Sequence, residues 1–97
     1  MYEHMVLFKF ANDPTEQQLA HLTQLAHGLN EHIAGIVDLA IGRNTSSRNQ
    51  GFQVGLTVRF QDKAALDAYG PHPKHQELVA FTLEMGRTDI IVVDFPM

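Results

Sequence analysis

The distribution of hydrophobic and polar residues along the chain predicts four β-strands. The clearest segment is 52–60, where apolar residues take every second position and polar or small residues fill the positions between them. Segments 2–10, 36–41 and 88–95 are also predicted strands. The first and last of the four are apolar on both faces near their middle, so we expect both of their faces to be covered.

The longest predicted helix follows the first strand. Asp13 and Glu16 are spaced as a capping box, and Pro14 is expected to lie in the first turn. Gly35 is expected to end the helix. The apolar stripe that should face the sheet consists of Leu19, Leu22, Leu25, Ala26, Leu29 and Ile33.

Two shorter helices are predicted between the third and fourth strands. The first spans residues 63–69, is capped by Asp62 and is broken by Gly70-Pro71. The second begins with Pro73 in its first turn. Its core-facing stripe is predicted to be His75, Leu78, Val79, Thr82 and Leu83.

The resulting order is β-α-β-β-α-β when the two short helices are counted together. Two β-α-β repeats predict an α+β ferredoxin-like protomer, in which an antiparallel four-stranded sheet has its helices on one face. The other face then needs a partner, because the first and last predicted strands are apolar there as well. The simplest partner is a second copy of the same sheet, so we predict a homodimer whose sheets meet face to face.

The composition narrows the class of protein. A chain of 97 residues is expected to form a single domain, 1–97, and the absence of cysteine excludes disulfides and thiolate metal sites. The net charge is −4 and the seven basic residues are scattered, so we expect no nucleic-acid partner. The apolar run 5–8 is too short for a signal peptide or a membrane span; we expect no membrane partner and a cytoplasmic location.

Three polar residues stand out because the pattern directs them toward the core. His4 shares a strand face with apolar residues, His75 lies in a helical apolar stripe, and Tyr69 lies at the break before that helix. Buried imidazole and phenol groups need hydrogen-bond partners, and a small polar pocket between helices and sheet would supply them. The alternative is that each residue has a purely structural role.

Asp94 is a fourth candidate, near the end of the last strand. Its carboxylate could accept a hydrogen bond from a histidine nitrogen and fix the tautomer, or it could simply meet water at the strand end. The spacing of His72 and His75 also suggests a metal site. No third ligand is evident, however, and His72 as a helix cap would point away from the core, so neither a metal nor a cofactor is predicted.

Several stretches across nearly the whole chain form a family pattern. They are residues 4–10 (HMVLFKF), Gly35-Ile36, Gly51-Phe52, residues 69–75 (YGPHPKH) and Val93-Asp94-Phe95. This pattern resembles the stress-responsive A/B-barrel (Dabb) family, and the Tyr-x-x-His-Pro-x-His stretch is its most specific part. The resemblance implies a ferredoxin-like protomer that forms a dimeric α/β barrel, with the two sheets making the barrel.

The resemblance also implies a range of activities. The family includes plant stress-induced proteins with no settled reaction and a plant polyketide cyclase that closes a ring by aldol condensation without a cofactor. The catalytic residues of that enzyme match His4, Tyr69 and His75, and an aspartate matching Asp94 lies close by. That enzyme has a histidine where this chain has Val54, so the resemblance implies a pocket of different shape.

Three functional hypotheses follow. The first is a cofactor-free cyclase or lyase acting on a small hydrophobic or aromatic carbonyl compound, with His75 as a base oriented by Asp94. Tyr69 and His4 would then bind the enolate oxygen. The second is a non-catalytic, stress-responsive binding or protective protein. The third is a relative of dimeric α/β barrels that act as cofactor-free monooxygenases or bind haem.

Overall fold

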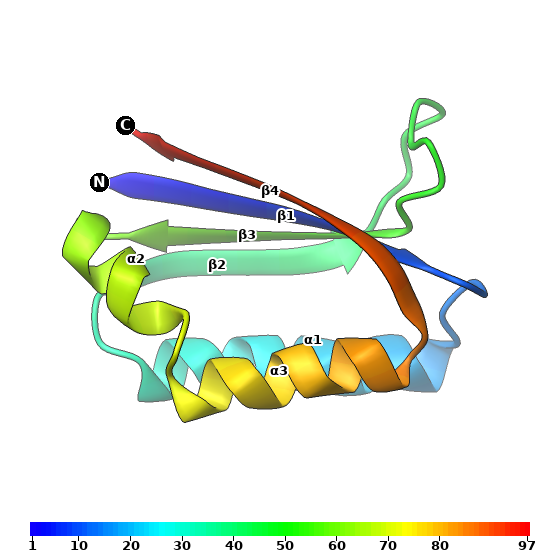
Figure 1. Ribbon diagram of the computed structural model, residues 1–97, viewed down its shortest axis with the longest axis horizontal. Coiled ribbons are helices and arrows are strands. Elements are labelled where there is room, and N and C mark those ends of the chain that lie inside the picture. The colour runs from blue at the N-terminus through cyan, green and yellow to red at the C-terminus, as the bar shows by residue number, and fades with distance from the viewer.

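The computed structural model describes residues 1–97 and contains seven helices and strands. These are β1 (Tyr2–Phe10), α1 (Glu16–His32), β2 (Ile36–Arg43), β3 (Val54–Phe60), α2 (Lys63–Tyr69), α3 (Pro73–Glu84) and β4 (Arg87–Pro96). The strands form one sheet in the order β2-β3-β1-β4, and every neighbouring pair is antiparallel. Helices α1 and α3 run side by side along one face of it (Figure 1). The ferredoxin-like prediction is confirmed.

The hydrophobic core lies between this sheet and the helices. Alternate residues of β3 are buried over its whole length, as the sequence pattern indicates, and Val54, Val58 and Phe60 have no exposed surface. Leu22 and Leu29 of α1 pack against them from the helical layer, with at most 1% of their surface exposed. Burial of these side chains supplies most of the driving force for folding.

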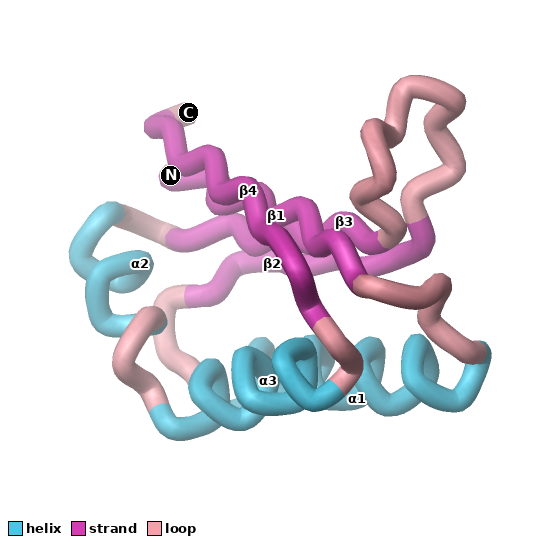
Figure 2. Tube along the Cα trace, turned by 45° about the vertical axis from the view of Figure 1, so that its right-hand side comes forward, coloured by secondary structure: helices cyan, strands magenta, loops and turns pink.

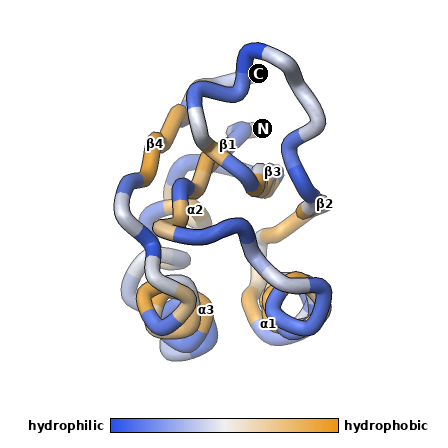
Figure 3. The backbone as a smooth tube through the Cα atoms, turned by 90° about the vertical axis from the view of Figure 1, so that its right-hand side faces the viewer, coloured by the Kyte–Doolittle hydropathy of each residue, from blue (hydrophilic) through white to orange (hydrophobic).

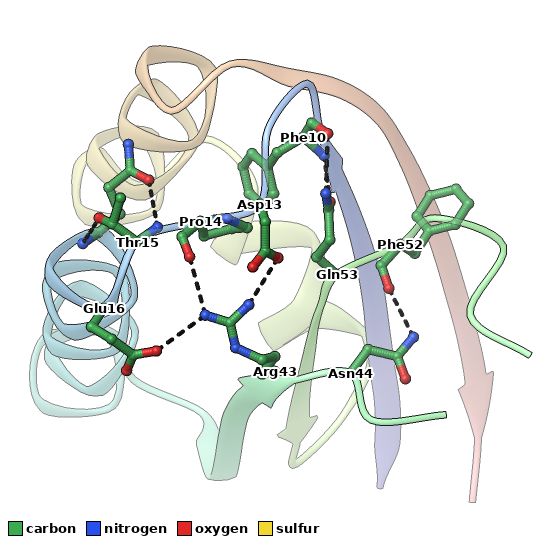
Figure 4. Close-up of polar contacts among 10 residues, drawn as sticks. Phe10, Asp13, Pro14, Thr15, Glu16, Arg43, Asn44, Phe52 and Gln53 are labelled. Atoms are coloured by element: carbon green, nitrogen blue, oxygen red, sulfur yellow. Dashed lines mark hydrogen bonds and ion pairs between the residues drawn. The ribbon is translucent and has the colours of Figure 1, made fainter. Parts of the chain in front are cut away.

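The N-terminus of α1 differs from the prediction. The cap is Thr15 instead of Asp13: its hydroxyl accepts a hydrogen bond from the backbone N–H of Gln18, whose side chain in turn accepts from the backbone N–H of Thr15. Asp13 instead accepts a hydrogen bond from Arg43 at the end of β2, at 2.9 Å (Figure 4). The helix therefore starts at Glu16, and Pro14 lies before it.

The end of α1 also comes earlier than predicted. The helix ends at His32, because Ile33 already has an extended backbone. Gly35 lies in the turn to β2 with φ of +90°. A Cβ on Gly35 would stand 2.5 Å from the Cβ of Ala65 in α2, so no side chain fits between the turn and that helix.

The strand boundaries shift by a few residues. β2 extends to Arg43, β3 begins at Val54 instead of Phe52, and β4 runs from Arg87 to Pro96. Phe52 is still buried, although it precedes the strand, and its carbonyl accepts a hydrogen bond from Asn44 (Figure 4). The loop between β2 and β3 projects from the sheet on the side away from the helices (Figure 2).

Helix α3 begins as predicted. His72 is its cap, with its Nδ1 accepting from the backbone N–H of Lys74 at 3.1 Å, and Pro73 occupies the first turn. One member of the predicted core stripe is wrong, since Leu83 is 55% exposed. Phe81 packs against the core instead. None of the three helices combines the length and the apolar character needed to cross a membrane.

The sheet face opposite α1 and α3, which we call the open face, is covered by no helix (Figure 2). Both β1 and β4 contain hydrophobic stretches (Figure 3). Met5 pairs with Val93 and Leu7 pairs with Ile91 across the two strands, and Phe95 continues the row. Between 37% and 48% of each of these five residues is exposed, so the apolar second face predicted for the first and last strands is present.

Candidate functional site

A cavity of about 190 Å³ lies on the helical side of the sheet. It is bounded by β1, β3 and β4 and by helices α2 and α3, and nine of its thirteen lining residues are hydrophobic. His4, Tyr69 and His75 all line it, although 71 positions separate the first from the last. His4 reaches it from the helix-facing side of β1, Tyr69 from the end of α2 and His75 from the first turn of α3.

Tyr69 is the most deeply buried polar member of this group. It is 2% exposed, and its ring packs against those of His4, Phe60 and His75 at centroid distances of 5.6, 5.0 and 4.2 Å. Its hydroxyl is buried and has no hydrogen-bond partner. Burial raises the pKa of Tyr69, so the phenol stays protonated at neutral pH and its O–H is a free donor.

His75 is held in one tautomer. Its Nδ1 lies 2.8 Å from the carbonyl oxygen of Gly70, and because a carbonyl only accepts, Nδ1 carries the hydrogen. The Nε2 of the neutral ring then bears a lone pair. Burial lowers the pKa of His75, against the opposing effect of the Gly70 hydrogen bond, so the ring is neutral at pH 7.

Asp94 pairs with His4 and not with His75. Residues 4 and 94 are directly opposite in the β1–β4 pairing, and Nδ1 of His4 donates to Oδ1 of Asp94 at 2.5 Å. The hypothesis that Asp94 orients His75 is therefore wrong in its geometry, because the Gly70 carbonyl has that role. Asp94 instead fixes the ring orientation of His4, with Nε2 as the nitrogen left over.

The pattern of His72 and His75 produces no metal site in this structure. The Nδ1 of His72 is used in capping α3, and no group of three potential metal-ligating side chains occurs in the protein.

Two polar features of the cavity wall were not predicted from the sequence. One is the carbonyl of Gly70, which is invisible in a side-chain pattern. The other is Arg87, a half-buried residue in the cavity wall. Its position directly after Gly86, at the start of the last strand, was the only signal in the sequence. Simple alternation would place Arg87 on the same face as Asp89, but a β-bulge between Lys9 and Phe10 shifts the register, so that Arg87 pairs with Phe10 on the helix-facing side.

A separate polar cluster lies on the open face. Glu3 is 8% exposed, and it accepts hydrogen bonds from Thr57 Oγ1 at 2.6 Å and from Arg59 Nε at 3.1 Å. The Thr57 hydrogen bond, helped by Arg59, lowers the pKa of Glu3. Both donors are on β3, and all three side chains are on the side of the sheet opposite the cavity. This polar cluster therefore lies on the open face, beside its apolar row, and is not part of the site.

Comparisons with solved structures identify the same fold elsewhere. A crystal structure of an Arabidopsis thaliana protein matches with a TM-score of 0.86 and 21% identity, covering 100% of this chain and 95% of that one. A dimeric ferredoxin-like protein of unknown function from Jannaschia matches with a TM-score of 0.82 and 26% identity, over 99% and 98% of the two chains. Hydroxynitrile lyase from Passiflora edulis matches with a TM-score of 0.81 and 14% identity, over 97% and 90%.

The sequence comparisons reach the level of family. The Arabidopsis thaliana stress-response A/B barrel domain-containing protein DABB1 is 31% identical over 98 residues, which cover 96% of this chain and 45% of that protein. The chain thus spans less than half the length of that relative. The family model of the stress responsive A/B barrel domain matches residues 2–97. The chain therefore belongs to the stress-responsive A/B barrel (Dabb) domain family.

Proposed function

We propose that the cavity binds a small carbonyl compound and that His75 removes a proton from the carbon next to its carbonyl group. The observation that carries this proposal is the pairing of a free donor with a free base in one apolar cavity. The Tyr69 hydroxyl has no partner, and the Gly70 carbonyl leaves Nε2 of His75 with a lone pair. A carbonyl ligand would occupy both groups at once.

The reaction balances without any further reagent. Nε2 of His75 takes the proton from the α-carbon, and the electrons of that C–H bond move to the carbonyl oxygen, which becomes an enolate. The Tyr69 O–H donates to this oxygen, and its raised pKa keeps the proton on the phenol. The enolate carbon then attacks a second carbonyl, or is reprotonated, and the imidazolium of His75 returns the proton.

His4 is the second polar side chain beside Tyr69 in the cavity wall, with the two ring centroids 5.6 Å apart. Asp94 accepts from Nδ1, so the imidazole is fixed with Nε2 directed away from the carboxylate. Because Nδ1 already carries a hydrogen, only the imidazolium form of His4 can donate from Nε2 to the enolate oxygen. This arrangement supports a cyclase or lyase of the aldol type, and a neighbour of the same fold is named a hydroxynitrile lyase.

The size of the cavity fits a ligand with a single ring or a short chain. An apolar protein cavity of roughly 150 Å³ is large enough to bind benzene, and this one measures about 190 Å³. Nine hydrophobic lining residues favour an apolar body with one or two polar groups.

The elementary step can be measured without knowledge of the natural substrate. Acetophenone has slowly exchanging hydrogens next to its carbonyl, and proton NMR in D₂O follows their replacement by deuterium. We expect the protein to accelerate this exchange, and His75→Ala to slow it by roughly 10²- to 10⁴-fold, the usual contribution of a positioned base.

His27→Ala is the matched control, because His27 is exposed on α1 and does not line the cavity. This variant should keep the wild-type exchange rate. Equal rates for the wild type and His75→Ala, or equal losses for both histidine variants, would contradict the assignment of His75 as the base.

The apolar cavity equally suits a binding protein that performs no chemistry. In that case Tyr69 and His4 orient a hydrophobic ligand, and His75→Ala weakens binding with no reaction to lose. Binding of acetophenone without accelerated exchange, measured on the same samples, would favour this second function.

We also propose that the protein is a homodimer that buries the open face. The support is the row of five exposed apolar side chains on β1 and β4, together with solved neighbours that are described as dimeric. Two sheets that meet through this face would form the barrel typical of the predicted assembly. Light scattering coupled to size exclusion measures it directly.

A further inference from the structure

Arg87 lies at the cavity wall and is anchored at a buried point. Its Nη1 donates to Oγ1 of Thr82 at 3.1 Å, and Thr82 has no exposed surface. The Thr82 hydroxyl donates in turn to the carbonyl of Val79 at 2.7 Å, so its lone pair is free to accept from the arginine. The guanidinium is therefore held beside α3 and does not extend freely into solvent.

Most of the hydrogen-bonding capacity of this guanidinium is unused. A guanidinium has five N–H donors, and the bond to Thr82 is the one hydrogen bond that Arg87 makes through its side chain. Arg87 takes part in none of the six ion pairs of the protein. It is also the only Lys, Arg, Asp or Glu among the thirteen residues of the cavity wall.

The cavity consequently has two polar regions with an apolar stretch between them. Thr82 follows His75 by seven residues on α3, which is two turns along the same side of the helix and about 10 Å. Tyr69, with its unpartnered hydroxyl, lies beside His75, with the two rings 4.2 Å apart. The wall between the two regions includes Leu78, Val79 and Val92.

We propose that the ligand is a small oxo acid, with its carboxylate bound by Arg87 and its carbonyl at Tyr69 and His75. This inference rests on the proposed function and names the substrate class of the same site. The planar guanidinium matches the two oxygens of a carboxylate, and the surrounding apolar wall strengthens the interaction. A chain of five or six carbons spans the separation once hydrogen-bond lengths of about 3 Å are counted at each end.

A purely structural role accounts for only part of these observations. The bond to Thr82 joins the start of β4 to the last turn of α3, where a cation also interacts favourably with the helix C-terminus. That role uses one donor and requires no cavity. It predicts that loss of Arg87 lowers stability without changing the charge preference of the ligand site.

The test compares two ligands that differ in charge and hardly in shape, 5-oxohexanoate and 5-oxohexanamide. Titration calorimetry of the wild type should give at least roughly tenfold tighter binding of the acid, as expected for a charge-assisted hydrogen bond. This preference should shrink as salt is added. In Arg87→Gln the acid and the amide should bind with similar affinity, whereas Arg87→Lys should keep part of the preference.

Arg48→Gln is the matched control. Arg48 is exposed in the loop between β2 and β3 and does not line the cavity, so this substitution removes the same charge outside the site. It should retain the wild-type preference. Equal binding of acid and amide by the wild type overturns the proposal and leaves the carbonyl pocket intact. Failure of both compounds, together with failure of acetophenone, overturns the pocket itself. If Arg87→Gln does not fold, the wild-type ratio, its salt dependence and Arg87→Lys still decide the matter.

Discussion

At the scale of single residues, Tyr69 has the clearest energetic reason to bind a ligand, because its hydroxyl is buried without a hydrogen-bond partner. A polar group buried without a partner destabilises a protein by roughly 1–3 kcal/mol, and the phenol of Tyr69 is in that state. The aromatic packing of its ring on three neighbours offsets this cost. A ligand oxygen that accepts from the hydroxyl removes the cost, so binding energy is available at this one atom.

The lowered pKa of His75 makes a prediction about stability. In the unfolded chain this imidazole titrates near 6.5, whereas in the folded protein burial disfavours the charged form. The unfolded state therefore binds more protons as the pH falls below about 6.5, and the free energy of unfolding decreases. Above that pH the contribution of His75 to stability is fully present. Urea denaturation at pH 7.5 and 5.5, at one protein concentration, measures the effect.

His75→Gln removes the titrating group and serves as the comparison. Its stability should fall less between these two pH values than that of the wild type. NMR titration of the His75 ring provides an independent check, with a pKa below 6.5 and the hydrogen on Nδ1. A pKa at or above 6.5, or an unchanged pH dependence in the variant, is incompatible with the buried neutral ring.

Residue spacing predicted which side chains meet at the site but not how they bond. The positions of His4 and His75 on core-facing surfaces follow from strand and helix periodicity, so both could be found from the sequence. The partner of Asp94 depends on which residue of β1 lies opposite it, and strand register places His4 there. The carbonyl that orients His75 belongs to the backbone, for which the sequence has no pattern.

At the scale of the helices, the choice between two possible caps determined where α1 begins. Asp13 and Thr15 both belong to residue types that cap helices, and each is followed three residues later by a partner residue. Arg43 decides between them, because it binds Asp13, the carbonyl of Pro14 and Glu16 from the end of β2 (Figure 4). A contact between positions 13 and 43 lies outside any local sequence pattern.

Two alanine variants distinguish the observed cap from the predicted one. Thr15→Ala removes the acceptor for the Gln18 N–H and should lower the free energy of unfolding by about 1 kcal/mol. Asp13→Ala removes an exposed ion pair with Arg43 and should have a smaller effect, since such pairs contribute little. Chemical denaturation of both variants gives the comparison, and a larger loss in Asp13→Ala would mean that Asp13 is the cap.

At the scale of the whole molecule, β4 links the site and the open face. This edge strand pairs only with β1 within the protomer. One side of it contributes Ile90 and Val92 to the cavity wall, and the other side contributes Ile91 and Val93 to the open face. The alternation of a β-strand therefore places the two surfaces back to back.

We expect Val93→Asp to convert the proposed dimer into a monomer. Val93 is 48% exposed on the open face, so a carboxylate there is tolerated by the protomer but would be buried without a partner in the dimer. Leu83→Asp is the matched control, because Leu83 is 55% exposed on α3, away from that face. Light scattering should give twice the protomer mass of 10.9 kDa for the wild type and the control, and the single mass for Val93→Asp.

The same variant tests whether assembly supports the site. Val93 does not line the cavity, yet its strand carries Asp94, which holds His4, and Arg87, which lies in the cavity wall. Without a second sheet on the open face, β4 would be held only by its pairing with β1 and by the Arg87–Thr82 hydrogen bond to α3, and its position would fluctuate more. We therefore expect monomeric Val93→Asp to bind acetophenone more weakly than Leu83→Asp, although both have an unaltered cavity lining. Equal binding by the two variants would show that the protomer alone maintains the site.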